Sequence, residues 1–287
     1  MLILPLPGNG ALARDLAERL DAELGVLESR QFPDGESYIR LVSKVAGREV
    51  VLVCTLARPD DQFLRLAFTA RTAREQGASM LTLVAPYLAY MRQDKAFHDG
   101  EAITSNQFAH LLSAQVDRLV TVDPHLHRHK ALAEIYGISA VALQAAPLLS
   151  DWIKRNVDDP LIIGPDAESD QWATSIAAGA PAVVLRKTRN GDRDVTIEFP
   201  DLSLWKGRQP VLVDDIASSG RTLIEACKGL ATRGFAKPIC VVIHPLFAGD
   251  SFKALSGVAG RVVSTDTVPH ETNAISVVEL LAQCLAQ

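Results

Sequence analysis

The chain has 287 residues, of which 48% are hydrophobic and 22% charged, a balance typical of a globular protein with one large or two modest domains. Its formal net charge of -5 argues against a general nucleic-acid binder, because such proteins carry a basic face. No stretch approaches the roughly 20 apolar residues of a membrane span, and the N-terminus lacks the basic start of a signal peptide. We therefore expect a cytoplasmic protein with neither nucleic-acid nor membrane partners, in which local basic clusters meet anionic ligands.

Short apolar runs alternate with segments of helical periodicity along the whole chain, a pattern typical of α/β architecture. In the first half the predicted strands are 2–4, 26–31, 38–42, 49–55, 80–85 and 118–122, and the predicted helices are 11–24, 60–76 and 105–114. In the second half the predicted strands are 161–164, 182–186, 195–199, 211–213, 239–243 and 261–264, with helices around Trp152, at 171–178, at 223–232 and after Ile275. We predict two α/β domains, residues 1–147 and 148–287, each a mostly parallel sheet flanked by helices. A duplication would explain two such halves, although no sequence repeat establishes it.

The first motif is the turn FPDGE at residues 32–36, whose Pro and Gly restrict the backbone. Alone it would indicate only a turn between two strands. An aromatic ring beside two carboxylates also suits a purine, which the ring stacks against while a carboxylate accepts from the amino group. Phe32, Asp34 and Glu36 are therefore candidates for a nucleobase site.

Two further segments follow strand ends in the first half. PYLAYMRQD, residues 86–94, ends in Arg92, Gln93 and Asp94, and an Arg offers a planar fork for phosphate oxygens. VDPHLHRH, residues 122–129, places Asp123 and His125 where they suit magnesium and phosphate. The alternating histidines also allow zinc, but we favour magnesium, which prefers oxygen ligands and few all-protein contacts.

The second half contains a strand ending in Pro165-Asp166 and a basic hairpin, RKTRNGDRD, at residues 186–194. Asn-Gly is a strong hairpin-turn signal. The hairpin is either a solvated surface element or a mobile basic arm that closes over a polyphosphate and neutralises charge during transfer. Lys187 and Arg189 are the candidates for that role.

The most informative stretch is VLVDDIASSGRT, residues 211–222. A short apolar run predicts a buried parallel strand, and the Gly-containing turn after it leads into a helix. Backbone N–H groups of such a turn and of a helix start form a cradle for a phosphate. The carboxylates of Asp214 and Asp215 can accept hydrogen bonds from a sugar diol. The stretch predicts a site for a phosphorylated sugar.

These motifs resemble those of a known family. Residues 211–222 look like the phosphoribosyl-binding loop of the type I phosphoribosyltransferase fold. FPDGESYIRL at 32–41, together with the motifs at 86–94, 122–129, 161–169 and 186–194, resembles segments of the ribose-phosphate pyrophosphokinases, in the same order. Members of that family make phosphoribosyl pyrophosphate and AMP from Mg²⁺-ATP and ribose 5-phosphate.

The resemblance implies a role for each matched position. The residues implied for ATP are Phe32, Asp34, Glu36, Arg92, Gln93 and Asp94. Those implied for ribose 5-phosphate are Asp166, Asp214, Asp215, Ala217, Ser218, Ser219, Gly220, Arg221 and Thr222. Asp123, His125 and Asp166 are implied for Mg²⁺, and Lys187, Arg189 and His125 for catalysis. The resemblance also implies a homo-oligomer, either a dimer or a multiple of dimers, with sites completed across subunits.

Two alternatives remain open at the level of sequence. A nucleobase phosphoribosyltransferase would explain residues 211–222 but leaves FPDGE, RQD and the whole first half without a purpose. A non-catalytic regulatory paralogue of the synthase is the other alternative, because Glu168, Ser169 and Arg221 depart from the family pattern.

Overall fold

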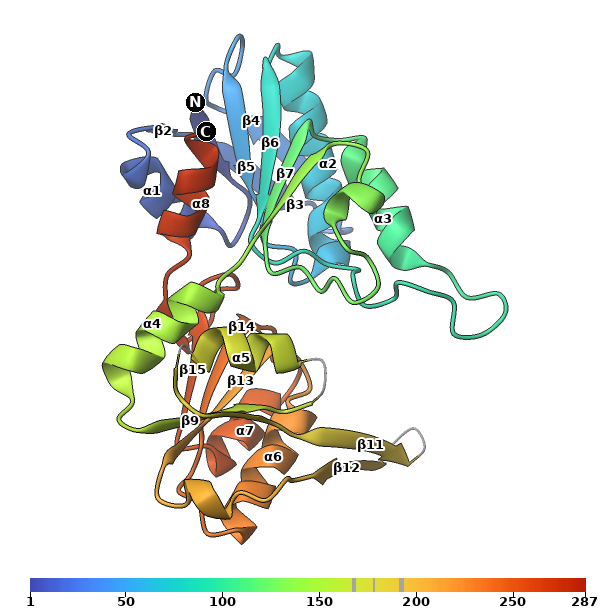
Figure 1. Ribbon diagram of the computed structural model, residues 1–287. Coiled ribbons are helices and arrows are strands. Elements are labelled where there is room, and N and C mark those ends of the chain that lie inside the picture. Colours follow the sequence, from blue (N-terminus) through green and yellow to red (C-terminus); the bar gives the residue numbers. More distant parts are fainter. Residues whose placement is uncertain (167–168, 178, 191–193) are drawn as a thin grey trace. The chain divides into compact units, whose positions relative to one another are not determined.

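The computed structural model describes residues 1–166, 169–177, 179–190 and 194–287, with backbone alone for 170–172, 187–190 and 194–196. The chain forms two compact units: unit 1 comprises residues 1–144 and 278–287, and unit 2 comprises residues 145–277. Each unit contains a six-stranded sheet with helices on both faces (Figure 1). The predicted α/β fold class is therefore confirmed. Within the described ranges, no helix combines the length and the hydropathy needed to cross a membrane.

The sheet of unit 1 has the strand order β2-β1-β5-β6-β7-β8, and all neighbouring strands are parallel. The strands are β1 (Leu2–Pro5), β2 (Glu23–Leu24), β5 (Glu49–Val53), β6 (Met80–Ala85), β7 (Arg118–Val122) and β8 (Ser139–Leu143). Helix α1 (Gly10–Arg19) covers one face, and α2 (Pro59–Glu75) and α3 (Thr104–Ser113) cover the other (Figure 1). The central strands are mostly apolar, and Thr82 and Thr121 within them are buried as well, because helices cover both faces of a parallel sheet.

The sheet of unit 2 has the order β10-β9-β13-β14-β15-β16, again parallel throughout. Its strands are β9 (Pro160–Gly164), β10 (Ala182–Val184), β13 (Gln209–Ala217), β14 (Ile239–Pro245), β15 (Arg261–Thr265) and β16 (Asn273–Ile275). Its helices are α4 (Ala146–Asn156), α5 (Asp170–Ala177), α6 (Arg221–Thr232) and α7 (Ser251–Val258). The core between the sheet and α6 is a cluster of buried aliphatic side chains that includes Leu212, Leu223 and Val242.

The two units share one connectivity. In each unit the first strand, β1 or β9, lies second from the edge of the sheet, and the following strand, β2 or β10, forms the edge. The chain then makes an antiparallel hairpin before it returns to the middle of the sheet as β5 or β13. The hairpin is β3 (Leu27–Gln31) with β4 (Ser37–Leu41) in unit 1, and β11 (Arg186–Asn190) with β12 (Asp194–Glu198) in unit 2. Two short 3₁₀ turns, Leu132–Glu134 and Ser203–Trp205, complete the described elements. The repeated topology agrees with the hypothesis of two similar halves.

The last helix, α8 (Val278–Leu285), belongs to unit 1. It packs on α1, where the Arg19 guanidinium donates to Glu279 at 2.5 and 2.8 Å, and its end is tied to the sheet by Arg118, which donates to the Cys284 carbonyl at 3.0 Å. Helix α4 packs on α5 in the same topological position of unit 2. A linear division at residue 147 is thus wrong for the last ten residues, because α8 packs on α1 and belongs to unit 1.

Local boundaries also differ from those predicted. The helix predicted at 11–24 ends at Arg19, because Asp21 adopts a left-handed conformation (φ 49°) and Glu23 then pairs with β1. Strand β13 continues past the predicted end at 213 to Ala217, since Asp214 and Ile216 still pair with β14. Strand β8 and helix α7 were not predicted. Their short, mixed sequences become regular only by pairing with β7 or packing on the sheet.

Candidate active site

The turn between β13 and α6 has the form of a phosphate-binding loop. Residues 218–220 make the turn, Gly220 adopts the left-handed conformation (φ 65°) that suits glycine, and α6 begins at Arg221. The backbone N–H groups of Ser219 and Gly220 donate to no other described residue. The first N–H groups of α6 likewise point out of the helix. The turn therefore has backbone donors that could meet an anion, and the binding of a sugar phosphate by residues 217–222 stays a prediction.

Three carboxylates gather at the carboxyl edge of the unit 2 sheet, where the chain reverses its direction of winding between β9 and β13. Asp166 follows β9, and Asp214 and Asp215 lie near the end of β13. Burial, followed by the negative charges of Asp215 and Asp166, raises the pKa of Asp214 well above its usual range. A group of neighbouring carboxylates favours the binding of a proton, a cation or hydroxyl donors. The place where the winding of a parallel sheet reverses, its switch point, is also where ligands of such folds bind.

Ser169 fixes the loop that carries Asp166. Its Oγ accepts a hydrogen bond from the Asp166 backbone N–H at 3.1 Å, and its side chain is buried. The close approach of the Ser169 side chain to the backbone of residue 164 favours glycine there, because a Cβ on Gly164 would lie 2.6 Å from Ser169 Oγ. Ser169 therefore supports the loop, whereas Glu168, the other departure noted in the sequence, lies outside the described residues. Arg221 is exposed in the first turn of α6.

The basic hairpin of unit 2 is antiparallel, with Lys187 opposite Ile197 and Arg189 opposite Val195. Of these two basic residues only the backbone is described. The hairpin is confirmed as an element, and the catalytic role of Lys187 and Arg189 stays a prediction.

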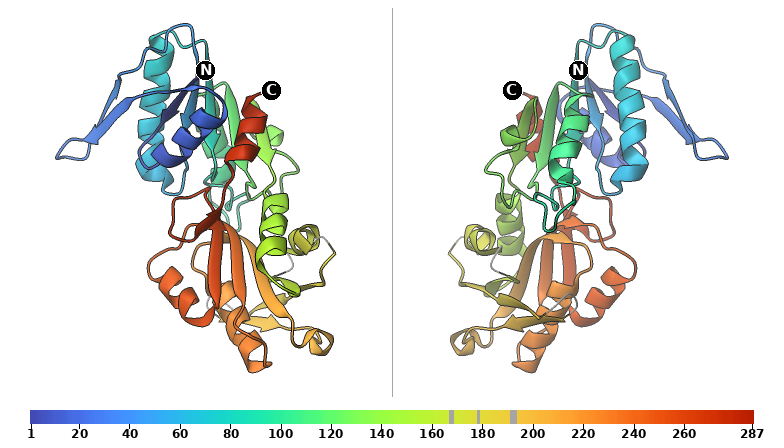
Figure 2. Two further views of the ribbon diagram at one scale, coloured as in Figure 1. Left: turned by 90° about the vertical axis from the view of Figure 1, so that its left-hand side faces the viewer. Right: turned by 90° about the vertical axis from the view of Figure 1, so that its right-hand side faces the viewer.

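In unit 1, Phe32, Asp34 and Glu36 lie at the tip of the β3–β4 hairpin, which projects from that unit (Figure 2) while β4 contacts α2. The Phe32 N–H donates to the Glu36 carbonyl at 2.8 Å, and the Glu36 N–H donates to Asp34 Oδ1 at 3.2 Å. The Arg30 guanidinium lies 4.6 Å from the centre of the Phe32 ring and 4.3 Å from that of Tyr38. Sequence reasoning missed Arg30, whose guanidinium lies over the ring of Phe32, the residue predicted to stack on the base.

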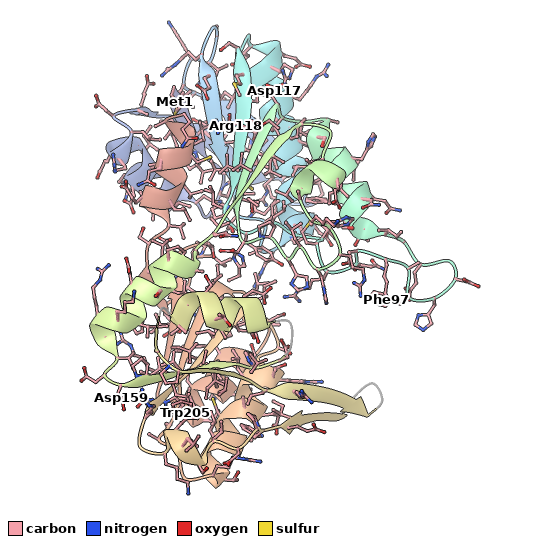
Figure 3. The ribbon with its side chains drawn as sticks, in the orientation of Figure 1. Met1, Phe97, Asp117, Arg118, Asp159 and Trp205 are labelled. Carbon is pink, nitrogen blue, oxygen red and sulfur yellow. The ribbon has the colours of Figure 1, made fainter. Side chains whose placement is uncertain are left out.

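The segments at 86–94 and 122–129 meet in unit 1. Arg128 donates to Asp94 Oδ1 at 2.5 Å, and the Asp94 side chain is only 2% exposed, whereas Arg92 and Gln93 are more accessible. The Lys95 ammonium and the Arg128 guanidinium lie 5.0 and 5.9 Å from the centre of the Phe97 ring, which is labelled in Figure 3. Asp94 therefore forms an ion pair with Arg128, a residue that sequence reasoning did not single out.

Asp123 and His125 follow β7 as predicted, both half-buried, with Asp123 in a left-handed conformation (φ 37°). The His125 ring meets that of His127 edge-on at 5.8 Å. Among the described residues, no group of three or more His, Cys, Asp or Glu side chains is arranged to hold a metal ion.

These features, two parallel sheets of one topology and a phosphate-type loop at the switch point of the second, define a two-domain α/β protein of the phosphoribosyltransferase fold. The family model for the N-terminal domain of ribose phosphate pyrophosphokinase matches residues 1–115, and that for the phosphoribosyl transferase domain matches residues 132–270. A crystal structure of phosphoribosylpyrophosphate synthetase from Mycobacterium smegmatis has the same fold, with a TM-score of 0.86, 24% identity, and coverage of 99% of this chain and 97% of that one.

Curated relatives are similar over nearly their full length. The ribose-phosphate pyrophosphokinase of Methanothermobacter thermautotrophicus is 32% identical over 288 residues, covering 99% of both chains. That of Saccharolobus solfataricus is 34% identical over 275 residues, covering 93% of both chains. The chain belongs to the ribose-phosphate pyrophosphokinase family.

Proposed function

We propose that the protein is a ribose-phosphate diphosphokinase, which transfers the pyrophosphoryl group of ATP to the C1 hydroxyl of ribose 5-phosphate. The hydroxyl oxygen attacks the β-phosphorus in line, the bond from that phosphorus to the α-phosphate oxygen breaks, and AMP leaves. The products are phosphoribosyl pyrophosphate and AMP. The observation that carries the proposal is the turn at 218–220, with donors directed to no described protein group, beside the carboxylates of Asp214 and Asp215. Family membership supports it.

In this proposal unit 2 binds ribose 5-phosphate. The backbone and side chains of residues 217–222 hold the 5-phosphate, and Asp214 and Asp215 accept hydrogen bonds from the ribose diol. Burial, and after it the charges of neighbouring carboxylates, raise the pKa of Asp214, and hydroxyl donors from the sugar would offset both effects. Hydrogen bonds from the ribose hydroxyls would therefore stabilise these carboxylates, which favours binding.

Unit 1 binds ATP in this proposal. Phe32 stacks on the adenine, with Asp34 and Glu36 accepting from its amino group, while Arg92, Gln93 and His125 contact the phosphates. Asp94 contributes by holding Arg128 at this loop. Since the tip of the β3–β4 hairpin projects from its own unit, it is open to a nucleotide held by another subunit (Figure 2). This supports a homo-oligomer, a dimer or a multiple of dimers, with shared ATP sites, and we place it in the cytoplasm.

The candidate ligands for Mg²⁺ are Asp123, His125 and Asp166. Mg²⁺ prefers oxygen donors and is held by one or two carboxylates together with substrate phosphates. The carboxylates of Asp123 and Asp166 fit that preference. The nitrogen donors of His125 fit less well and suit the ATP phosphates better. When bound, the ion would neutralise phosphate charge.

Catalysis by the chain's own residues then requires only positioning and charge stabilisation, as is usual in phosphoryl transfer. Lys187 and Arg189, on the β11–β12 hairpin, would meet the transferring group, and His125 would hold the phosphates from unit 1. No residue forms a covalent bond to the substrate.

Formation of AMP from ATP and ribose 5-phosphate, measured in a coupled assay, tests the proposal. We expect AMP in the presence of Mg²⁺ and ribose 5-phosphate, and none when ribose replaces it. Absence of AMP would contradict the proposal. Release of pyrophosphate from phosphoribosyl pyrophosphate and a nucleobase would instead identify a phosphoribosyltransferase, and the absence of both activities a non-catalytic paralogue.

A further inference from the structure

The connection between β14 and α7, residues 246–250, bonds to the turn that follows β13. The Phe247 N–H donates to the Ala217 carbonyl at 2.8 Å, and the Ala248 N–H donates to the Ser218 carbonyl at 3.0 Å. The Oγ of Ser251, the first residue of α7, donates to the same Ser218 carbonyl at 2.9 Å. Three donors therefore hold two consecutive carbonyls of the predicted phosphate loop.

Holding these carbonyls also fixes where the loop's N–H groups point. The peptide unit is planar and trans, so its C=O and N–H point in opposite directions. The peptide whose carbonyl belongs to Ala217 carries the N–H of Ser218, and the peptide whose carbonyl belongs to Ser218 carries the N–H of Ser219. Both N–H groups are thus directed away from the β14–α7 connection, and neither donates to another described residue. They are aimed at the space where the turn would receive an anion.

The connection is itself braced. Phe247 adopts a left-handed conformation (φ 31°) that is strained for a bulky residue and persists only when its surroundings over-determine it. Its ring lies 5.3 Å from that of Phe252 and 4.8 Å from that of His270, and these two rings lie 4.7 Å apart. The aromatic contacts hold the backbone from which the Phe247 and Ala248 amides donate.

Of the three donors to these carbonyls, only the Ser251 hydroxyl belongs to a side chain, so a substitution can remove it. Ser251 is 9% exposed, and its backbone carbonyl would lie 3.8 Å from a Cβ placed on Gly220, so it borders the loop at a second point. We propose that Ser251 is a positioning residue for the sugar phosphate: with the β14–α7 backbone, it orients the N–H groups of Ser218 and Ser219 toward the 5-phosphate. The inference rests on the proposed function, and it means that the first residue of α7 contributes to the affinity for ribose 5-phosphate.

The test compares ribose 5-phosphate binding, by calorimetric titration of the full-length protein, with the KM for ATP. Ser251→Ala removes one of two donors to the Ser218 carbonyl, so we expect ribose 5-phosphate to bind about threefold to tenfold more weakly. The KM for ATP should not change. Ser256→Ala, an exposed serine on the same helix, is the matched control and should bind like the wild type.

A second pair of variants separates orientation from packing. Ser251→Thr keeps the hydroxyl and Ser251→Val has the same shape without it, so Thr should retain affinity and Val should lose it. Equal ribose 5-phosphate affinities for Thr and Val, or equal loss of ribose 5-phosphate and ATP affinity, would overturn the positioning role. Wild-type protein that bound no ribose 5-phosphate would instead overturn the proposed function, and this role with it.

Discussion

The side chain of Asn9 joins the ends of β1 and β5 in unit 1: its Oδ1 accepts a hydrogen bond from the Thr55 N–H at 2.8 Å. Its Nδ2 donates to the carbonyls of Leu6 and Pro7 at 3.3 and 3.0 Å, and the residue is 2% exposed. β1 and β5 are the strands of unit 1 that correspond to β9 and β13 of unit 2. The switch point that carries Asp166 and Asp214 in unit 2 is therefore bridged in unit 1 by a neutral amide.

This bridge makes Asn9 a stability determinant of unit 1. Asn9→Ala removes the side-chain acceptor of the Thr55 N–H and the side-chain donor to the Pro7 carbonyl, and the loss of these hydrogen bonds costs about 1–3 kcal/mol. We expect a lower unfolding temperature in calorimetry. Gln107→Ala, an exposed position on α3, is the control and should change stability little. An Asn9→Ala protein as stable as the wild type would contradict the bridging role.

The carboxylates of unit 2 predict a pH-dependent stability of the ligand-free protein. Burial and neighbouring negative charge raise the pKa of Asp214 above the ordinary value of 3.8, so the folded state holds this proton more tightly than the unfolded state does. Stability is therefore lost as pH rises from that ordinary value through the raised pKa, and the loss is complete above it.

Asp214→Asn removes the titrating carboxyl group and with it the loss of stability at higher pH. The variant keeps an Oδ1 atom, which in the wild type accepts a hydrogen bond from the Asp215 N–H at 3.0 Å. We expect an unfolding temperature at neutral pH that is higher by about 2–4 °C for each kcal/mol recovered, with ribose 5-phosphate binding impaired. Thermal melts across pH compare the two proteins. An unchanged pH profile would show that Asp214 is not the group responsible.

The Asp94–Arg128 pair should be coupled in its effect on stability. Arg128→Ala leaves the Asp94 carboxylate buried without its cation and should destabilise unit 1 by about 1–3 kcal/mol. The double variant with Asp94→Asn should recover part of that loss, because no uncompensated charge remains. Chemical unfolding measures both. Glu75→Gln, which breaks an exposed ion pair with Arg71, is the control and should change the free energy of unfolding little. Additive losses in the double variant would contradict the coupling.

Lys187→Ala tests the catalytic role of the β11–β12 hairpin. If Lys187 stabilises the transferring group, kcat should fall by about 10²–10³ while the KM for ATP changes little. Steady-state kinetics with ATP and ribose 5-phosphate provide the measurement. Lys206→Ala, an exposed cation elsewhere in unit 2, should keep its activity. An unchanged kcat in Lys187→Ala would exclude this role.

Sequence alone was sufficient wherever the signal is local. The apolar run before Asp214 predicts a buried strand, and the small residues before Arg221 predict a turn into a helix, because strand burial and turn chemistry depend on neighbouring residues. The same holds for the hairpins at FPDGE and at Asn190. The order of such segments was enough to predict the α/β class, and the resemblance of the motifs to those of a known family predicted the family.

Only the tertiary structure decided which distant residues meet. Arg128 pairs with Asp94, 34 positions away, and Ser251 donates to Ser218, 33 positions away; neither contact leaves a periodic or spacing signal in the sequence. The return of α8 to α1 is likewise unreadable, because an amphipathic helix specifies that it must bury one face but not against which sheet. Local chemistry thus determined the parts of each site, and long-range packing decided how firmly they are held.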